Sequence, residues 1–256
     1  MDLFDQRAAL DESEGQYGLS GEMKKTQYIL QLLGAPWCPD TLKCILVAAE
    51  QGMEMTCGLV DTSENEQNSS EYLAVSEFGV VPALKESDYA TAGVRAITEF
   101  INARGLGNTL IPMNAVQASD QDCWIEIART QAEPAINTLV AECVCSDNGD
   151  SAKIDAAKST LGPILDQLND ALAKNDYIVS KNFTLADIHW EADMHLLGLT
   201  AGSDLIESRA NIKTWLNKVN NKKSACGQDV KAASFLPSAA DIKAKKLPPI
   251  IKIEDF

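Results

Sequence analysis

One cysteine of this chain lies where its chemistry can differ from that of an ordinary thiol. Cys38 follows the short apolar run 28–33 and the turn 34–37, and Pro39 comes directly after it. Proline suits the first turn of a helix, so we expect the cysteine at a helix N-terminus. The unpaired N–H groups and the positive end of the helix dipole favour a thiolate there, and a thiolate is a nucleophile. The alternative is a small buried cysteine with a structural role only.

The other candidates for redox or metal chemistry are weaker. Cys44 lies six residues after the candidate nucleophile, about 600° around a helix, so it is not placed to act as a resolving thiol. His189 and His195 are separated by the same interval and cannot bind one metal ion together. Cys143 and Cys145 have no second cysteine or histidine cluster to complete a site. We therefore expect no metal.

The elements around Cys38 predict an α/β domain. The apolar run before it has the length of a buried strand, and apolar residues recur at helical spacing after it until Gly52. The expected strands are 28–33, 55–60, 79–84 and 89–91, and the expected helices are 39–51, 70–76 and 94–103. Alternating strands and helices are typical of a sheet covered by helices.

The second half of the chain predicts helices only. Apolar stripes at three- and four-residue spacing indicate helices at roughly 118–145, 151–172, 185–199 and 209–220. We therefore divide the chain into an acidic N-terminal extension, an α/β domain, a linker, an all-helical domain and a C-terminal extension. The boundaries are 1–25, 26–104, 105–117, 118–235 and 236–256.

These stretches together resemble the glutathione transferase superfamily, over roughly residues 26–220. The matching stretches are 34–39, 43–44, 71–73, 79–84, 95–101 and 183–188. The combination of Val-Pro-Ala-Leu at 81–84 with Thr-Leu-Ala-Asp at 184–187 is specific for the fold. The resemblance implies an α/β plus all-α protein, in which an N-terminal thioredoxin-like domain is followed by an all-helical glutathione-transferase C-terminal domain.

The resemblance also implies a glutathione site. Cys38 matches the thiol of cysteine-type members, omega-like or glutaredoxin-like, which forms a mixed disulfide with glutathione. Val81 and Pro82 match a cis-proline position at which the preceding residue offers its backbone to glutathione. Lys43 or Arg95 would supply the local positive charge that this anionic tripeptide needs.

The chain departs from the family at one point of this site. Counting from Leu84, the family's Glu-Ser pair, which binds the γ-glutamyl end of glutathione, falls on Gly93 and Val94. Both side-chain contacts are therefore absent, and each hydrogen bond to a charge is worth about 1.5–3 kcal/mol. We expect weaker glutathione binding at Gly93 and Val94 unless backbone N–H groups, Thr91 or Arg95 compensate.

Two residues of the helical half are candidates for a second-substrate pocket. Trp124 and Arg129 lie in the helix with which family members line that pocket, although a tryptophan at such a position is more often part of the core. The box 184–187 has a structural role, because a threonine and the aspartate three residues later cap a helix together. The resemblance implies a small-molecule electrophile or disulfide as substrate, and a homodimer.

The charge balance excludes some partners. The 22 Lys and Arg against 37 Asp and Glu give a formal net charge of −15. This field repels nucleic-acid phosphates and anionic lipid head groups. No apolar stretch approaches the roughly 18 uncharged residues of a membrane-spanning helix. We expect neither nucleic-acid binding nor membrane insertion.

The two ends and the cysteines suggest surroundings and partners. The acidic stretch 1–25 and the locally basic stretch 243–253 are not needed by the family core, and each is a candidate contact to a protein partner. The C-terminal stretch is expected to lie either on the protein's own surface or on an acidic partner. The start lacks the features of a secretory signal, and the seven cysteines are an odd number, which together predict a cytoplasmic protein.

Two functions follow from these residues. The first is a glutathione-dependent thiol transferase or reductase with Cys38 as nucleophile. The second is a non-catalytic binding or assembly subunit that keeps the fold and has lost glutathione binding, as the departure at Gly93 and Val94 suggests.

Overall fold

A computed structural model describes residues 30–105, 107–223, 231–247 and 250–251. Its N-terminal domain is built on β1 (Leu30–Gly34), in which Leu30 and Leu32 are buried and Gln31 faces outward. This alternation turns one face of the strand toward the core. The predicted N-terminal extension, 1–25, and the first residues of the predicted strand lie outside the described residues.

The sheet is mixed. β1 pairs in parallel with β2 (Met55–Leu59) and antiparallel with β3 (Ala83–Glu86), which turns back into β4 (Tyr89–Ala92). The two-residue strand β5 (Ile250–Ile251) pairs with the outer edge of β2, so the strand order is β4-β3-β1-β2-β5. The first four strands and their helices form the predicted thioredoxin-like domain, and this part of the fold class is confirmed.

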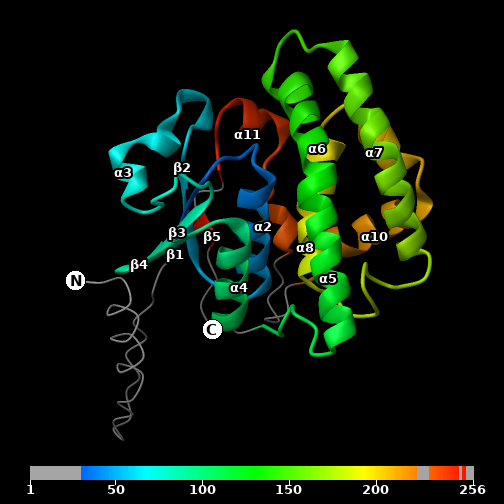
Figure 1. Ribbon diagram of the computed structural model, residues 1–256, viewed down its shortest axis with the longest axis horizontal. Helices are drawn as coiled ribbons and strands as arrows, with labels where there is room; N and C mark the ends of the chain where they lie inside the picture. The colour runs from blue at the N-terminus through cyan, green and yellow to red at the C-terminus, as the bar shows by residue number, and fades with distance from the viewer. Residues whose placement is uncertain (1–29, 106, 224–230, 248–249, 252–256) are drawn as a thin grey trace, which may run out of the picture.

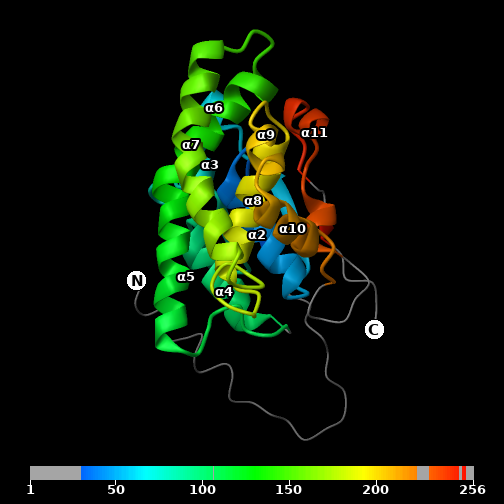
Figure 2. The same cartoon turned by 90° about the vertical axis from the view of Figure 1, so that its right-hand side faces the viewer.

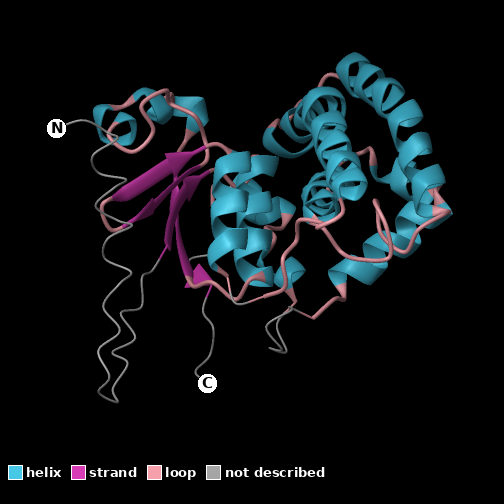
Figure 3. Cartoon of the chain, turned by 60° about the horizontal axis from the view of Figure 1, so that its bottom comes forward, coloured by secondary structure: helices cyan, strands magenta, loops and turns pink. Residues whose placement is uncertain are grey.

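Two helices separate the sheet from the second domain. α2 (Pro39–Glu50) and α4 (Val94–Arg104) pack on each other between the sheet and the helical domain, as Figure 3 shows. α3 (Ser70–Leu73) lies away from them and is shorter than the predicted helix 70–76 (Figure 1). Nearly every side chain of α2 is buried, because this helix contacts both domains. Polar groups on α2 therefore need partners inside the protein.

The second domain is all-helical, as predicted. Its helices are α5 (Ala115–Ile127), α6 (Glu133–Val140), α7 (Ser151–Leu172), α8 (Leu185–Gly198), α9 (Ser203–Glu207) and α10 (Ala210–Asn220). The predicted helix 118–145 is a continuous helical stretch that begins at Ala115 and contains π-helical turns at Ala128–Ala132 and Ala141–Cys145. The first turn comes just before Pro134, whose missing N–H interrupts regular α-helical bonding. α9 was not predicted, because it is too short to show a period.

α8 is the central helix of this domain and packs against α2, α5, α6 and α10 (Figure 2). Its Trp190 is fully buried and donates its indole N–H to the Trp124 carbonyl oxygen at 3.1 Å. The helix begins at the predicted capping box, where the Asp187 carboxylate accepts the Thr184 backbone N–H at 2.9 Å. This box fixes the start of the buried helix.

The C-terminal extension lies on the chain's own surface wherever the structure describes it. Just before the extension, the turn Ala232–Phe235 packs on α2. Within it, α11 (Ala239–Lys243) packs against the π-helical turn at Ala141–Cys145. Lys245 then forms an ion pair with Asp61, next to β2. The extension thus runs from the helical domain back to the sheet, where β5 covers the β2 edge.

Glu191, on α8, makes the stability of the fold depend on pH. Burial, with smaller contributions from Glu50 and Asp187, raises the pKa of its carboxyl from 4.5 to about 8. Because the native chain holds this proton more tightly than the unfolded chain, the free energy of unfolding falls as pH rises from about 4.5 to about 8. We expect Glu191→Gln to raise the free energy of unfolding at pH 8 by about 3–4 kcal/mol and to change it little at pH 4.5.

Urea denaturation at both pH values measures this effect. The control Glu207→Gln neutralises an exposed carboxylate on α9, and should shift the free energy of unfolding by less than about 0.5 kcal/mol. A gain of equal size at pH 4.5 and pH 8 would show that packing, and not ionisation of Glu191, is responsible.

Candidate active site

Cys38 occupies the N-cap of α2, as predicted. Its backbone N–H donates to the Ala35 carbonyl at 3.1 Å, which closes the turn after β1, and its own carbonyl accepts the N–H groups of Thr41 and Leu42. The Thr41 hydroxyl accepts the Ala35 N–H at 3.1 Å and packs against Gly34, where a Cβ would lie only 2.4 Å from this oxygen. The Cys38 side chain makes no capping hydrogen bond and is half-buried. The thiol is therefore held at the helix start.

The surroundings of this thiol do not lower its pKa, so that prediction was wrong. Burial and the nearby carboxylate of Asp40 raise the pKa of Cys38 above its ordinary value, and hydrogen bonds from Thr41 and Asp40 offset part of this rise. The helix N-terminus was visible in the sequence, but Asp40, two residues further on, brings a negative charge to the same place. The thiol form is therefore favoured at neutral pH.

The peptide bond between Val81 and Pro82 is cis, as the resemblance implied. The register pairs Leu33 with Ala83, so Val81 and Pro82 lie beside the turn that follows β1. Tyr72 connects the two segments. Its hydroxyl donates to the Val80 carbonyl at 2.7 Å, and burial, with a smaller contribution from Cys38, raises the pKa of this phenol. The sequence analysis did not single out Tyr72.

Gly93 and Val94 begin α4, where the family's Glu-Ser pair falls. Gly93 is the N-cap residue, with φ 88°, and its N–H donates to the Pro82 carbonyl at 2.9 Å. No side chain caps this helix, and Val94 is almost fully buried. The first N–H groups of α4 are therefore the polar groups available at this position, since neither residue has a side-chain donor or acceptor.

Lys43 does not supply a free positive charge, contrary to the prediction. Its ammonium is completely buried, at 3.0 Å from Asp40 Oδ1, 2.5 Å from Glu133 Oε1 and 3.6 Å from Asp193 Oδ1. We call these four residues the Lys43 cluster. Lys43 lies on a helix face that the helical domain covers, so its charge is balanced by carboxylates and does not reach a ligand. Sequence periodicity alone could not show which face the second domain covers.

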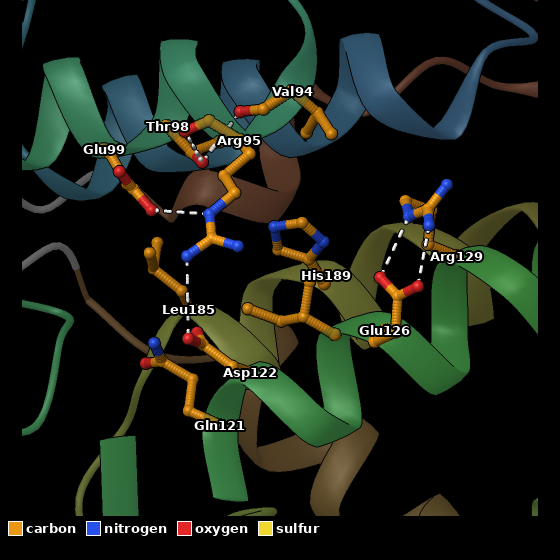
Figure 4. Close-up of a pocket in the computed structure, with 11 residues that line it drawn as sticks. Val94, Arg95, Thr98, Glu99, Gln121, Asp122, Glu126, Arg129, Leu185 and His189 are labelled. Carbon is orange, nitrogen blue, oxygen red and sulfur yellow. Dashed lines mark hydrogen bonds and ion pairs between the residues drawn. The ribbon is translucent and has the colours of Figure 1, made fainter. Parts of the chain in front are cut away.

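A cavity of about 270 Å³ lies between α4, α5 and α8 (Figure 4). It is lined by Val94, Arg95, Thr98, Glu99, Gln121, Asp122, Ile125, Glu126, Arg129, Leu185 and His189. The cavity thus contains the predicted site residues Val94 and Arg129, together with Arg95, which was expected to supply positive charge. Cys38 is not part of its lining.

The cavity has charged walls and a neutral centre. Arg95 bonds to Glu99 at 2.9 Å and reaches Asp122 on α5 at 3.6 Å, while Arg129 pairs with Glu126 at 2.7 Å. His189 lies between these pairs in Figure 4, and its Nδ1 has no hydrogen-bond partner among the described residues. Burial, and to a lesser degree Lys43, lowers the pKa of His189 well below its ordinary value, so the ring is neutral. A cavity of this kind suits a small organic molecule.

Trp124, the other predicted second-substrate residue, does not line this cavity. Its ring packs edge-on against Trp190, with ring centroids 6.0 Å apart, so it belongs to the core of the helical domain. The structure therefore supports the alternative in which Trp124 is a core residue. The physical reason is that α8, on the inner side of α5, presents an aromatic partner of matching size.

Neither a cluster of metal ligands nor a bilayer-spanning helix occurs in the part of the chain that the structure describes. No cluster of three or more His, Cys, Asp and Glu side chains there could hold a metal ion. His195 donates its Nε2–H to the Pro237 carbonyl oxygen at 2.8 Å. None of the described helices combines the length and apolarity needed to cross a bilayer.

A thioredoxin-like domain with a cysteine at the N-cap of its first helix, a cis X–Pro bond before β3 and an all-helical second domain define a glutathione-transferase fold. Residues 132–223 match the family model "Glutathione S-transferase, C-terminal domain". This match and the fold support membership of the glutathione transferase superfamily.

Known relatives agree with this assignment. Glutathione S-transferase F10 of Arabidopsis thaliana is 26% identical over 210 residues, which cover 79% of this chain and 97% of the relative. Glutathione S-transferase 3 of Zea mays is 26% identical over 73% of this chain and 86% of its own length. The crystal structure of glutathione transferase F7 from Populus trichocarpa superposes with a TM-score of 0.70, at 26% identity, over 80% of this chain and 98% of that one.

Proposed function

We propose that this chain is a glutathione-dependent thiol transferase in which Cys38 is the nucleophile. The observation that carries the proposal is the placement of Cys38, whose side chain sits at the N-cap of α2 without capping it. The cis bond before Pro82 lies beside it, where the backbone of Val81 would align the glutathione cysteine. The transferase names of the relatives are consistent with this chemistry.

The proposed reaction is a pair of thiol–disulfide exchanges. The Cys38 thiolate attacks the glutathione sulfur of a mixed disulfide R–S–S–G, so a Cys38–glutathione disulfide forms and R–S⁻ leaves and takes up a proton. The thiolate of a second glutathione then attacks the glutathione sulfur of that disulfide. This step releases oxidised glutathione and restores the Cys38 thiolate. No further oxidant or reductant is needed.

The cavity between α4, α5 and α8 is the proposed place for the second substrate. Its lining includes Arg129, a predicted second-substrate residue, and Val94, the first residue of α4. A small electrophile or disulfide fits its size. The proposal includes cytoplasmic location and a homodimer, for which the exposed Phe78 provides an apolar contact on the N-terminal domain.

Exposure of the full chain to oxidised glutathione tests the proposal. We expect intact mass spectrometry and peptide mapping to find one glutathione disulfide-bonded to Cys38, and addition of reduced glutathione to remove it. A chain that acquires no adduct on Cys38, at a pH where the thiol ionises, is not a transferase of this type.

A non-catalytic binding or assembly subunit is the second candidate, and Gly93 and Val94 favour it. The start of α4 has no side chain for the charged end of glutathione. This alternative expects no heat of glutathione binding in calorimetry at millimolar ligand. It also predicts that the chain binds a protein partner and that this binding is lost when residues 1–23 or 237–256 are deleted. Measurable glutathione binding by the full chain argues for the transferase.

A further inference from the structure

The Lys43 cluster joins the two domains immediately behind the candidate nucleophile. Lys43 and Asp40 belong to α2, Glu133 to α6 and Asp193 to α8. The ammonium and the Asp193 carboxyl are completely buried, and the Glu133 side chain is only 9% exposed. A charge that is buried to this degree is retained only where it is paired. The three carboxyl groups hold the ammonium in its charged form and in one place.

Asp40 is the member of this cluster closest to Cys38 in the chain, and its charge acts on the thiol. It lies two residues after Cys38, in the first turn of α2, and its side chain is 25% exposed, more than that of any other member. Lys43 reaches back by three residues and holds Asp40 Oδ1 at 3.0 Å. Without this contact, the Asp40 carboxylate would be a free negative charge beside the thiol. With it, the charge that acts on Cys38 belongs to an ion pair.

We propose that Lys43 is a positioning residue that fixes and neutralises Asp40, and that the helical domain thereby controls the reactivity of Cys38 through Glu133 and Asp193. The inference rests on the proposed function in taking Cys38 as the nucleophile. Lys43 itself contacts no substrate, because its side chain is completely buried between α2 and the helical domain. It acts through Asp40.

The groups that face the cluster from each packed element support this role. On α8, His189 lies one turn before Asp193 and is neutral. From the π-helical turn before α6, Arg129 contributes a weaker positive charge near Glu133. Burial raises the pKa of Asp193 well above its ordinary value, and neither of its carboxyl oxygens has a hydrogen-bond partner among the described residues. The Lys43 ammonium opposes this rise, so Asp193 takes part in the charge balance of the cluster.

A double-mutant cycle tests the inference in the full chain. The measurement is the alkylation rate of Cys38 by iodoacetamide as a function of pH, followed on the peptide that contains Cys38. We expect Lys43→Met to slow alkylation at pH 7 about tenfold, as one unit of thiol pKa implies, and Asp40→Asn to accelerate it several-fold. Lys43→Met should have no further effect in the Asp40→Asn background, because the residue acts through Asp40.

The controls separate positioning from a general loss of structure. Lys43→Arg keeps the charge and should restore the rate to within about twofold of the native chain. Lys222→Met removes a lysine that pairs with Glu50 at the other end of α2, and should leave Cys38 unchanged. If Lys43→Met does not fold, the same comparison is made in a Glu133→Gln and Asp193→Asn background, in which no buried carboxylate loses its partner.

The inference is overturned if Lys43→Met leaves the alkylation rate unchanged, or if it slows alkylation equally with and without Asp40. The second result would mean that Lys43 acts directly on the thiol. Alkylation reports on Cys38 whether or not glutathione binds. Failure of the glutathione reaction would therefore overturn the proposed function, whereas the alkylation rates would still test the role of Lys43.

Discussion

A chain that carries Cys38→Ser should lose glutathione-dependent reduction of a small mixed disulfide by at least about a hundredfold. A hydroxyl does not ionise in the working range and cannot form the Cys38–glutathione disulfide on which the reaction depends. The native rate should also rise with pH through the alkaline range, because burial and Asp40 raise the pKa of the thiol and only the thiolate attacks. The measurement is the initial rate with a glutathione mixed disulfide, at several pH values.

The variant is expected to fold normally, which makes the loss of rate interpretable. The Cys38 side chain is half-buried and makes no capping hydrogen bond, and serine is itself a preferred N-cap residue. The matched control is Cys123→Ser, which changes an exposed cysteine on α5 and should keep the native rate. Equal rates for the native chain and Cys38→Ser would rule out the thiol mechanism and favour a binding subunit.

Asp187→Ala should destabilise the protein by about 3–5 kcal/mol, because it removes a fully buried acceptor that serves three segments. The carboxylate accepts the backbone N–H of Thr184 at 2.9 Å and of Ile178 at 3.0 Å, and the indole N–H of Trp215 at 2.9 Å. These hydrogen bonds offset part of the rise that burial causes in the pKa of Asp187. Each donor would be left without a partner inside the helical domain.

The chain contains a matched control for this prediction. Asp241 forms the same type of capping box with Ser238 at the start of α11, but at the exposed surface. Asp241→Ala should cost only about 1 kcal/mol, since water replaces the lost partner. Urea denaturation of both variants measures the difference. Equal losses would show that burial adds nothing to the capping box, against the argument given for Asp187.

The sequence predicted much of the fold because its signals are local. Helix 151–172 and the start of α8 at Leu185 agree with the structure, since apolar period, the Thr184–Asp187 box and Gly or Pro punctuation act within a few residues. The elements it missed are short or depend on distant pairing. α9 has no full period, and β5 exists only through its contact with β2. The π-helical turns interrupt a stretch in which the spacing of apolar residues predicts one helix.

The candidate site shows the same division between local and distant effects. Residue types and spacing alone determined the position of Cys38 before Pro39, the absence of Glu and Ser at Gly93 and Val94, and the proline after Val81. Only the tertiary structure decided how deeply these residues are buried and which charges Lys43 meets. Lys43 is enclosed because α6 and α8 close over α2 and bring carboxylates to it from residues 133 and 193. The effect of a charged group depends on the groups around it, and the carboxylates around Lys43 from α6 and α8 are distant from it in the chain.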